Sequence, residues 1–96
     1  MNIHIQYQHC PHNSNLDDFI KEEIQSDPLL SKDFFTSVKC FITKERHRDQ
    51  NVYNAKMIVH NKQHEDFVCS LSSSDPYSPW SELIKKTHHH FDKLFR

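Results

Sequence analysis

The sequence contains no glycine among its 96 residues. Glycine adopts positive φ angles most easily, so tight turns in this chain have to use asparagine, aspartate, serine, proline or lysine, of which asparagine and aspartate tolerate such angles best. Glycine is also required in the loops that hold phosphates in Walker-type and dinucleotide-binding sites. The sequence therefore excludes both kinds of nucleotide-binding loop.

Cysteine is scarce and odd in number. The three cysteines, Cys10, Cys40 and Cys69, lie far apart in the sequence. Cys40 and Cys69 fall where the pattern of apolar residues predicts a core, and free cysteine is common in cores as a small apolar residue. We therefore expect no disulfide framework, and we expect a reducing, cytoplasmic location.

Long apolar runs are also missing. No segment approaches the length of a membrane-spanning helix, and the N-terminus alternates polar and apolar residues, unlike the continuous apolar segment of a signal peptide. We therefore expect no membrane partner. The length allows one domain with a modest core.

The net charge is small but unevenly distributed. The formal charge of −1 does not indicate a nucleic-acid partner. Residues 16–26 nevertheless have a net charge of −3, and residues 36–64 have a net charge of +4. Segregated charge of this kind can steer binding although the total is near zero.

Polar and apolar residues alternate in three short runs between residues 36 and 71. A period of two predicts strands with one face toward a core. Short connections at 45–52 and 61–65 predict that these strands form an antiparallel meander. The side chains expected on the core face are Val38, Cys40, Ile42, Ala55, Met57, Val59, Phe67, Cys69 and Leu71. The side chains expected on the opposite face include Lys39, Phe41, Lys56, Ile58 and Val68.

The N-terminal third predicts a strand followed by a helix. Ile3, Ile5 and Tyr7 alternate with polar residues. The next apolar residues have helical spacing: Leu16, Phe19, Ile20 and Ile24. The possible N-caps of this helix are Asn13, Ser14 and Asn15. Residues 26–28 should end this helix, and the apolar residues expected to pack at the end of the sheet are Leu29, Leu30, Phe34 and Phe35.

The C-terminal segment predicts a second helix. Residues 72–76 combine N-cap residues with a proline, so we expect the helix to open there, with Pro76 and Pro79 in its first turn. Its apolar stripe is expected to contain Trp80, Leu83, Ile84, Phe91, Leu94 and Phe95.

Together these elements predict an α+β fold, a single domain over residues 1–96 with the order β-α-β-β-β-α. The sheet should be four-stranded and mixed, because a helix joins the first two strands and so makes them parallel, with a right-handed crossover. Both helices should pack on one face of the sheet and leave the other face exposed.

Nine histidines invite a metal-site or catalytic interpretation. His9, Cys10 and His12 lie within four residues, but zinc ligands usually come in two pairs of defined spacing, and C-x-x-C pairs are absent. Histidines 88–90 cannot converge on one point, because successive helical residues point about 100° apart. Catalytic pairs are formed in space rather than by adjacency in sequence. We therefore predict surface histidines, no metal site, no cofactor and no enzymatic activity.

Basic side chains recur in the predicted sheet and last helix. Lysine and arginine neutralise phosphates without contacting bases, and such binding weakens with salt. The alternative is that these charges only keep a small domain in solution. Arg46 and Arg48 are expected in the turn after the second strand, and histidines add charge at acidic pH. The candidate RNA-binding residues are Lys39, Arg46, Arg48, Lys56, Lys85, Lys86, His89, His90 and Lys93.

Six segments resemble the ribosome hibernation-promoting factors and ribosome-associated inhibitors, also called sigma-54 modulation proteins. These segments are 1–5, 16–20, 38–46, 54–60, 70–77 and 83–86. The resemblance rests on the order and spacing of these segments and covers nearly the whole chain. The Asp75-Pro76-Tyr77 sequence, expected to open the last helix, is the most specific motif.

The resemblance implies a domain that binds the small ribosomal subunit in the channel used by messenger and transfer RNA. Such proteins contact 16S ribosomal RNA and block translation under stress or when growth slows. Lys86, His89 and Lys93 occupy places where the family's last helix tends to have lysine or arginine, and Arg46 and Lys56 occupy basic places on the sheet. Recognition would be by shape and phosphate, since paired RNA bases are difficult to read. No DNA partner is expected.

The sequence also departs from this family. Residues 61–64 replace its Gly-Gly turn, and histidines 88–90 stand where arginine and glutamine are more usual. The chain ends after the second helix, so it resembles the short form and is expected to be a monomer. The alternative function is a protein-interaction module with weakened RNA binding, which would use Phe41, Ile58 and Val68.

Overall fold

The computed structural model describes residues 1–94 and the side chains of residues 1–93. The expected stripe members Leu94, as a side chain, and Phe95 lie outside this description. The elements in chain order are β1 (Asn2–Gln8), α1 (Ser14–Gln25), β2 (Phe35–His47), β3 (Gln50–Asn61), β4 (Phe67–Ser73), α2 (Pro79–Phe91) and the short 3-10 helix η1 (Asp92–Leu94).

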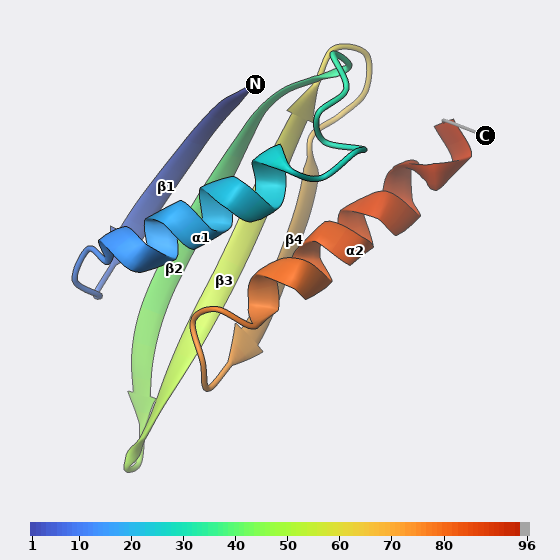
Figure 1. The fold of residues 1–96 in the computed structure, drawn as a ribbon. Coiled ribbons are helices and arrows are strands. Elements are labelled where there is room, and N and C mark those ends of the chain that lie inside the picture. The colour runs from blue at the N-terminus through green and yellow to red at the C-terminus, as the bar shows by residue number, and fades with distance from the viewer. Residues whose placement is uncertain (95–96) are drawn as a thin grey trace.

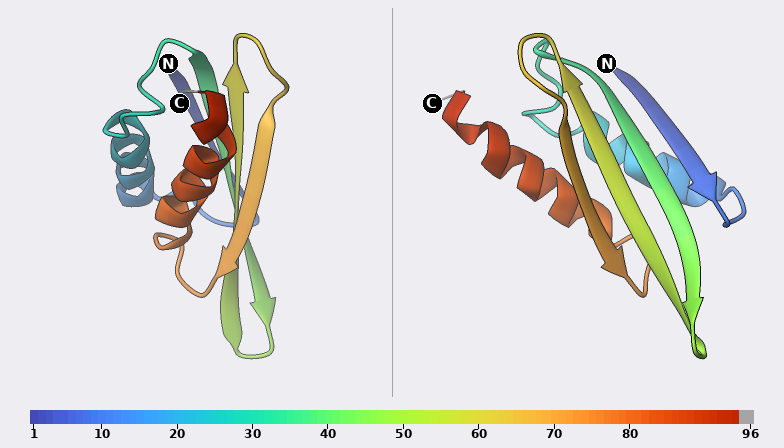
Figure 2. Two further views of the ribbon diagram at one scale, coloured as in Figure 1. Left: turned by 90° about the vertical axis from the view of Figure 1, so that its right-hand side faces the viewer. Right: turned by 180° about the vertical axis from the view of Figure 1, so that it is seen from behind.

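The four strands form one mixed sheet in the order β1-β2-β3-β4. β1 pairs with β2 in parallel, and the pairs β2–β3 and β3–β4 are antiparallel. Both helices lie on the same side of this sheet (Figures 1 and 2). The predicted α+β fold is therefore confirmed, including the meander and the parallel first pair. No helix among residues 1–94 is long and apolar enough to cross a membrane.

The core lies between the helices and one face of the sheet. The strand residues that are buried there as the alternation predicted are Val38, Cys40, Ile42, Ala55, Met57, Val59 and Cys69. Phe35, the first residue of β2, is buried as well. The helices contribute Leu16, Ile20, Ile24, Trp80, Leu83, Ile84 and Phe91. Phe67 and Leu71, on the edge strand β4, are only half-buried. Thr87 is buried although polar, because its hydroxyl donates a hydrogen bond to the Leu83 carbonyl oxygen at 2.9 Å.

The connection between β2 and β3 is shorter than the predicted 45–52 segment. β2 continues to His47 and β3 begins at Gln50, so only Arg48 and Asp49 join them. Arg48 adopts a φ of 58°, in the left-handed region that glycine would usually occupy. This hairpin extends beyond both helices (Figure 1). The alternation pattern did not predict these strand ends, because strands without a core beneath them need no alternation of apolar residues.

The second helix begins later than predicted. Asp75 accepts hydrogen bonds from the backbone N–H groups of Tyr77, at 3.2 Å, and Ser78, at 3.0 Å, and so forms a turn ahead of the helix. These backbone bonds lower the pKa of the Asp75 carboxyl group. Helix α2 starts at Pro79, which lies in its first turn as expected, whereas Pro76 precedes the helix. The carbonyl oxygen of Pro76 instead accepts a hydrogen bond from Trp80 Nε1 at 2.9 Å.

The start of α1 is fixed by Asn13. Its side-chain oxygen accepts a hydrogen bond from the Leu16 N–H at 3.1 Å, which identifies Asn13 as the N-cap among the three candidates. The Tyr7 hydroxyl lies 2.9 Å from the Asn13 carbonyl oxygen and 3.0 Å from Asp17 Oδ1, and thereby joins β1 to the helix. Burial, together with this contact to Asp17, raises the pKa of Tyr7. At the other end α1 stops at Gln25, before the Ser26-Asp27-Pro28 sequence that predicted its end.

We predict that Asn13→Ala lowers the free energy of unfolding by about 1 kcal/mol, because the first turn of α1 loses its side-chain acceptor. Asn15→Ala is the matched control, since Asn15 is exposed inside the same turn. Chemical denaturation followed by circular dichroism measures both. Equal stability of the two variants would show that the Asn13 cap contributes nothing.

Candidate nucleic-acid interface

The predicted RNA-binding residues fall into three groups in the structure. Lys39 and Lys56 lie on the face of the sheet that has no helix, which we call the open face. A second group lies on α2 and η1 and consists of Lys85, Lys86, His89, His90 and Lys93. All of these except Lys93 line a groove beside β4. The third group is Arg46 and Arg48. Arg46 lies on β2 and not in the turn as predicted, while Arg48 is at the hairpin tip.

The strand register arranges the open face in rows that run across the sheet. One row has only hydrogen-bonding side chains: Gln8, Thr43, Asn54 and Ser72. The next row contains Gln6, Phe41, Lys56 and Ser70. The third row contains His4, Lys39, Ile58 and Val68. These rows thus contain two lysines and no arginine, aspartate or glutamate.

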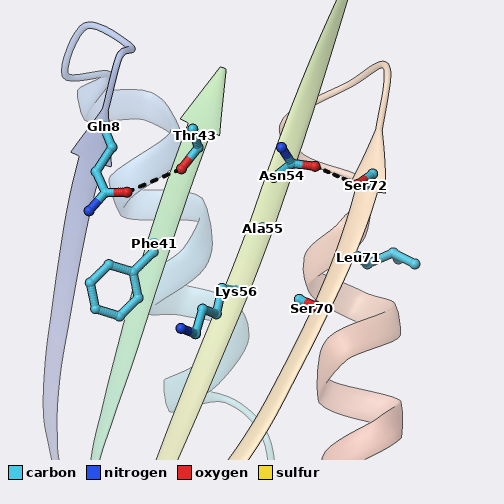
Figure 3. A pocket seen from close by; sticks show the side chains of 9 residues that line it. All are labelled: Gln8, Phe41, Thr43, Asn54, Ala55, Lys56, Ser70, Leu71 and Ser72. Carbon is cyan, nitrogen blue, oxygen red and sulfur yellow. Dashed lines mark hydrogen bonds between the residues drawn. The ribbon is translucent and has the colours of Figure 1, made fainter. Parts of the chain in front are cut away.

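A shallow cavity of about 560 Å³ lies over the first two rows (Figure 3). The Thr43 hydroxyl donates to Gln8 Oε1 at 3.4 Å, and the Ser72 hydroxyl donates to Asn54 Oδ1. Lys56 Nζ lies 5.8 Å from the centroid of the Phe41 ring, a cation–π contact. The cavity therefore combines amide and hydroxyl groups, one aromatic ring and one cation.

A groove of about 560 Å³ separates β4 from α2. Lys85, Lys86 and His89 line it, and the His90 ring stacks on Phe67 with centroids 4.2 Å apart and an interplanar angle of 18°. Lys85 Nζ lies 3.4 Å from Glu82 Oε1, an exposed ion pair that contributes little energy. The groove is therefore basic along its helical side.

Ser70 connects the groove to the open face. It is the cross-strand partner of Lys56, and its carbonyl oxygen accepts a hydrogen bond from Lys86 Nζ at 3.5 Å. β4 is the edge strand, so the open face and the groove adjoin along it. We call the surface formed by Lys39, Lys56, Lys85, Lys86, His89 and His90 the basic band. Arg46, at the end of β2, and Arg48, between β2 and β3, belong to the hairpin end. That end projects beyond the helices (Figure 1).

Carboxylates are absent from the centre of the open face. The strand segments 4–8, 39–43, 54–58 and 68–72 contain no aspartate or glutamate. Glu45, farther along β2, lies 3.1 Å from His47, and Asp66, just before β4, lies 2.7 Å from His60. The acidic residues of α1 lie on the helical side, where Asp17 pairs with Lys21 at 3.5 Å. The acidic segment of α1 and the basic residues of the open face, which are segregated in the sequence, thus lie on opposite sides of the sheet.

The cysteines and histidines form no metal site among residues 1–94, where no group of three or more potential ligands comes together. Cys10 is half-exposed, whereas Cys40 and Cys69 are buried. Burial, and more weakly the neighbouring Cys69, raises the pKa of the Cys40 thiol to about 12. His88, which the sequence did not single out, lies 2.7 Å from Asp27 Oδ1 and joins α2 to the connection after α1. That the protein is not an enzyme stays a prediction.

The comparisons with known proteins identify the fold. No family model matches the sequence, and no curated protein matches it. The solved structure of a ribosomal subunit interface protein from Coxiella burnetii superposes with a TM-score of 0.72, over 98% of this chain and 97% of that chain. The two sequences are 14% identical. The present chain therefore shares the fold of a ribosomal subunit interface protein over 98% of its length.

We predict that a thiol reagent at mildly alkaline pH modifies Cys10 alone in the folded protein, because the other two thiols are buried and have raised pKa values. Mass spectrometry should find one adduct before unfolding and three after it. Cys10→Ser should give no adduct in the folded state. Modification of Cys40 without unfolding would contradict the buried positions assigned to these thiols.

Proposed function

We propose that this protein is a non-enzymatic ribosome-binding factor that occupies the messenger and transfer RNA channel of the small subunit and inhibits translation under stress or in stationary phase. One observation is central to this proposal, namely that the fold matches a ribosomal subunit interface protein over 98% of the chain. The hibernation-factor resemblance of the sequence points to the same function independently of that match.

The basic band gives this proposal a physical mechanism. Lys39 and Lys56 lie on the open face, whose centre has no carboxylate, and Lys85 and Lys86 line the groove beside β4. In both places lysines neutralise RNA phosphates and displace counterions. Phosphate contacts position a protein without reading sequence, which suits binding to a structured RNA by its shape. The molecule is slender, with extents of 45 × 23 × 19 Å, and the hairpin with Arg46 and Arg48 provides a second, separate contact. Bound in the channel, it would exclude messenger and transfer RNA sterically.

A second candidate function is supported by apolar side chains on the open face. Val68 is 52% exposed, and Phe41 and Ile58 lie near it on the same face. A protein-interaction module would use this patch instead of the lysines. The two functions differ in their response to salt, because phosphate-driven binding falls steeply with ionic strength and apolar contact does not.

We predict that the purified protein co-sediments with small subunits and with whole ribosomes at low salt and dissociates at moderate salt. Gradient sedimentation at two salt concentrations measures this directly. Protein that stays at the top of the gradient at low salt would contradict ribosome binding. Co-sedimentation that is insensitive to salt would favour the apolar contact.

We also predict that the double substitution Lys86→Glu and Lys93→Glu weakens co-sedimentation and reduces the salt dependence by about one unit of slope for each phosphate that is no longer neutralised. The double substitution Lys21→Glu and Lys32→Glu is the charge-matched control, because it changes the net charge equally but lies on α1 and in the connection after it. If both double variants bind equally well, α2 is not part of the interface. Circular dichroism verifies that each variant is folded.

A further inference from the structure

We propose that the open face contains a base-stacking site for single-stranded RNA, centred on Phe41. This inference rests on the proposed function for the choice of RNA as the partner. It goes beyond that function because it assigns the open face to one unpaired base and not only to phosphates.

Phe41 provides the stacking surface. It is half-buried on a face that no helix covers, and its partners across the sheet are Gln6 on one side and Lys56 on the other. A flat aromatic ring that remains open to solvent on a sheet face binds bases of any sequence, because every base has a π-face. Figure 3 shows the ring beside the strands, and Figures 1 and 2 show that both helices lie on the other side of the sheet.

Lys56 is placed to contact the phosphate of a stacked nucleotide. In the free protein its ammonium lies 5.8 Å from the ring centroid of Phe41, where it uses the ring as a cation–π partner. Such a contact is weak at an exposed site, and a lysine side chain is long and flexible. When a base stacks on the Phe41 ring, the Lys56 ammonium group leaves the ring and pairs with the adjoining phosphate instead.

The row of amides and hydroxyls borders the same ring. Gln8 and Thr43 form one hydrogen-bonded pair, and Asn54 and Ser72 form the other. The Gln8 carbonyl oxygen is held by Thr43, so its amide nitrogen points away from that strand in Figure 3. Amide groups held in this way offer donors and acceptors to the edge of a base that lies over Phe41.

The composition of the open face favours RNA over a protein partner. Its three rows contain three large apolar side chains, Phe41, Ile58 and Val68, and the other side chains are amides, hydroxyls, lysines and one histidine. The centre of a protein interface is depleted in charged residues, whereas here lysines lie beside the aromatic ring. Two lysines and no carboxylate in these rows are complementary to the charge of a phosphate backbone.

The test measures binding of a short fluorescent oligoadenylate to the full chain at low salt by anisotropy. Phe41→Leu keeps the side chain apolar but removes the ring, and its dissociation constant should rise by about fivefold or more. Phe41→Trp should bind at least as tightly as the parent chain, and the oligoadenylate should quench the fluorescence of the introduced indole. Trp80 is buried and gives a constant background.

Two controls separate base stacking from other contacts. An abasic oligomer with the same sugar-phosphate backbone should bind equally to the parent chain and to Phe41→Leu. Ile58→Ala, on the neighbouring row, should change the dissociation constant for oligoadenylate by less than about twofold, because an aliphatic side chain gives no stacking surface. Equal binding of oligoadenylate to the parent chain and Phe41→Leu, or an equal loss in Ile58→Ala, would overturn the proposal. Absence of oligoadenylate binding would overturn it as well.

Co-sedimentation of the same variants with small subunits distinguishes this inference from the proposed function. Salt-sensitive co-sedimentation of the parent chain together with failure of the oligoadenylate test would leave ribosome binding intact and remove the stacking site. Stacking of oligoadenylate without co-sedimentation would support the site and contradict the ribosomal function. If Phe41→Leu weakens ribosome binding but not oligoadenylate binding, Phe41 contacts a protein and the stacking site is wrong.

Discussion

The apolar residues of β2, β3 and β4 alternate with polar ones, so the sheet can bury only one of its faces. Both helices cover that face, and their buried apolar residues form one core cluster with those of the strands. The other face is exposed to solvent, and its side chains include lysines, amides and one phenylalanine. Thus the same alternation that makes the core also produces the open face on which the proposed RNA contacts depend.

The edge position of β4 determines how the two basic regions meet. An edge strand separates the open face from the groove beside α2 by a single strand width. Lys56 is the register neighbour of Ser70 on β3, and Lys86 donates a hydrogen bond to the Ser70 carbonyl oxygen, so the two basic regions flank the same strand. A partner that binds over this edge contacts both regions at once. The acidic residues of α1 lie on the helical side and do not oppose such a partner.

The core and the fold could be predicted because they follow from local periodicity. Val38, Cys40 and Ile42 are buried where the alternation placed them, and Pro79 lies in the first turn of α2. Arg46 was misplaced because the hairpin projects beyond the core, where burial imposes no pattern. The choice of Asn13 over its neighbours depends on a hydrogen bond of the folded backbone, which composition does not reveal.

The arrangement of the candidate interface was harder to predict than its members. Sequence spacing indicates which face of α2 is polar but not which edge of the sheet the helix lies against. The proximity of Lys86 to Ser70, and the stacking of His90 on Phe67, therefore required the tertiary structure. The rows on the open face likewise depend on strand register, which fixes Lys56 opposite Phe41.

Ribosome binding through the basic band is tested most directly by a cryo-electron microscopy structure of this protein bound to the small ribosomal subunit. We expect density in the messenger and transfer RNA channel, with the basic band and the open face turned toward ribosomal RNA and α1 turned away. Density outside the channel, or an orientation that places the acidic surface of α1 against the RNA, would contradict the proposed function.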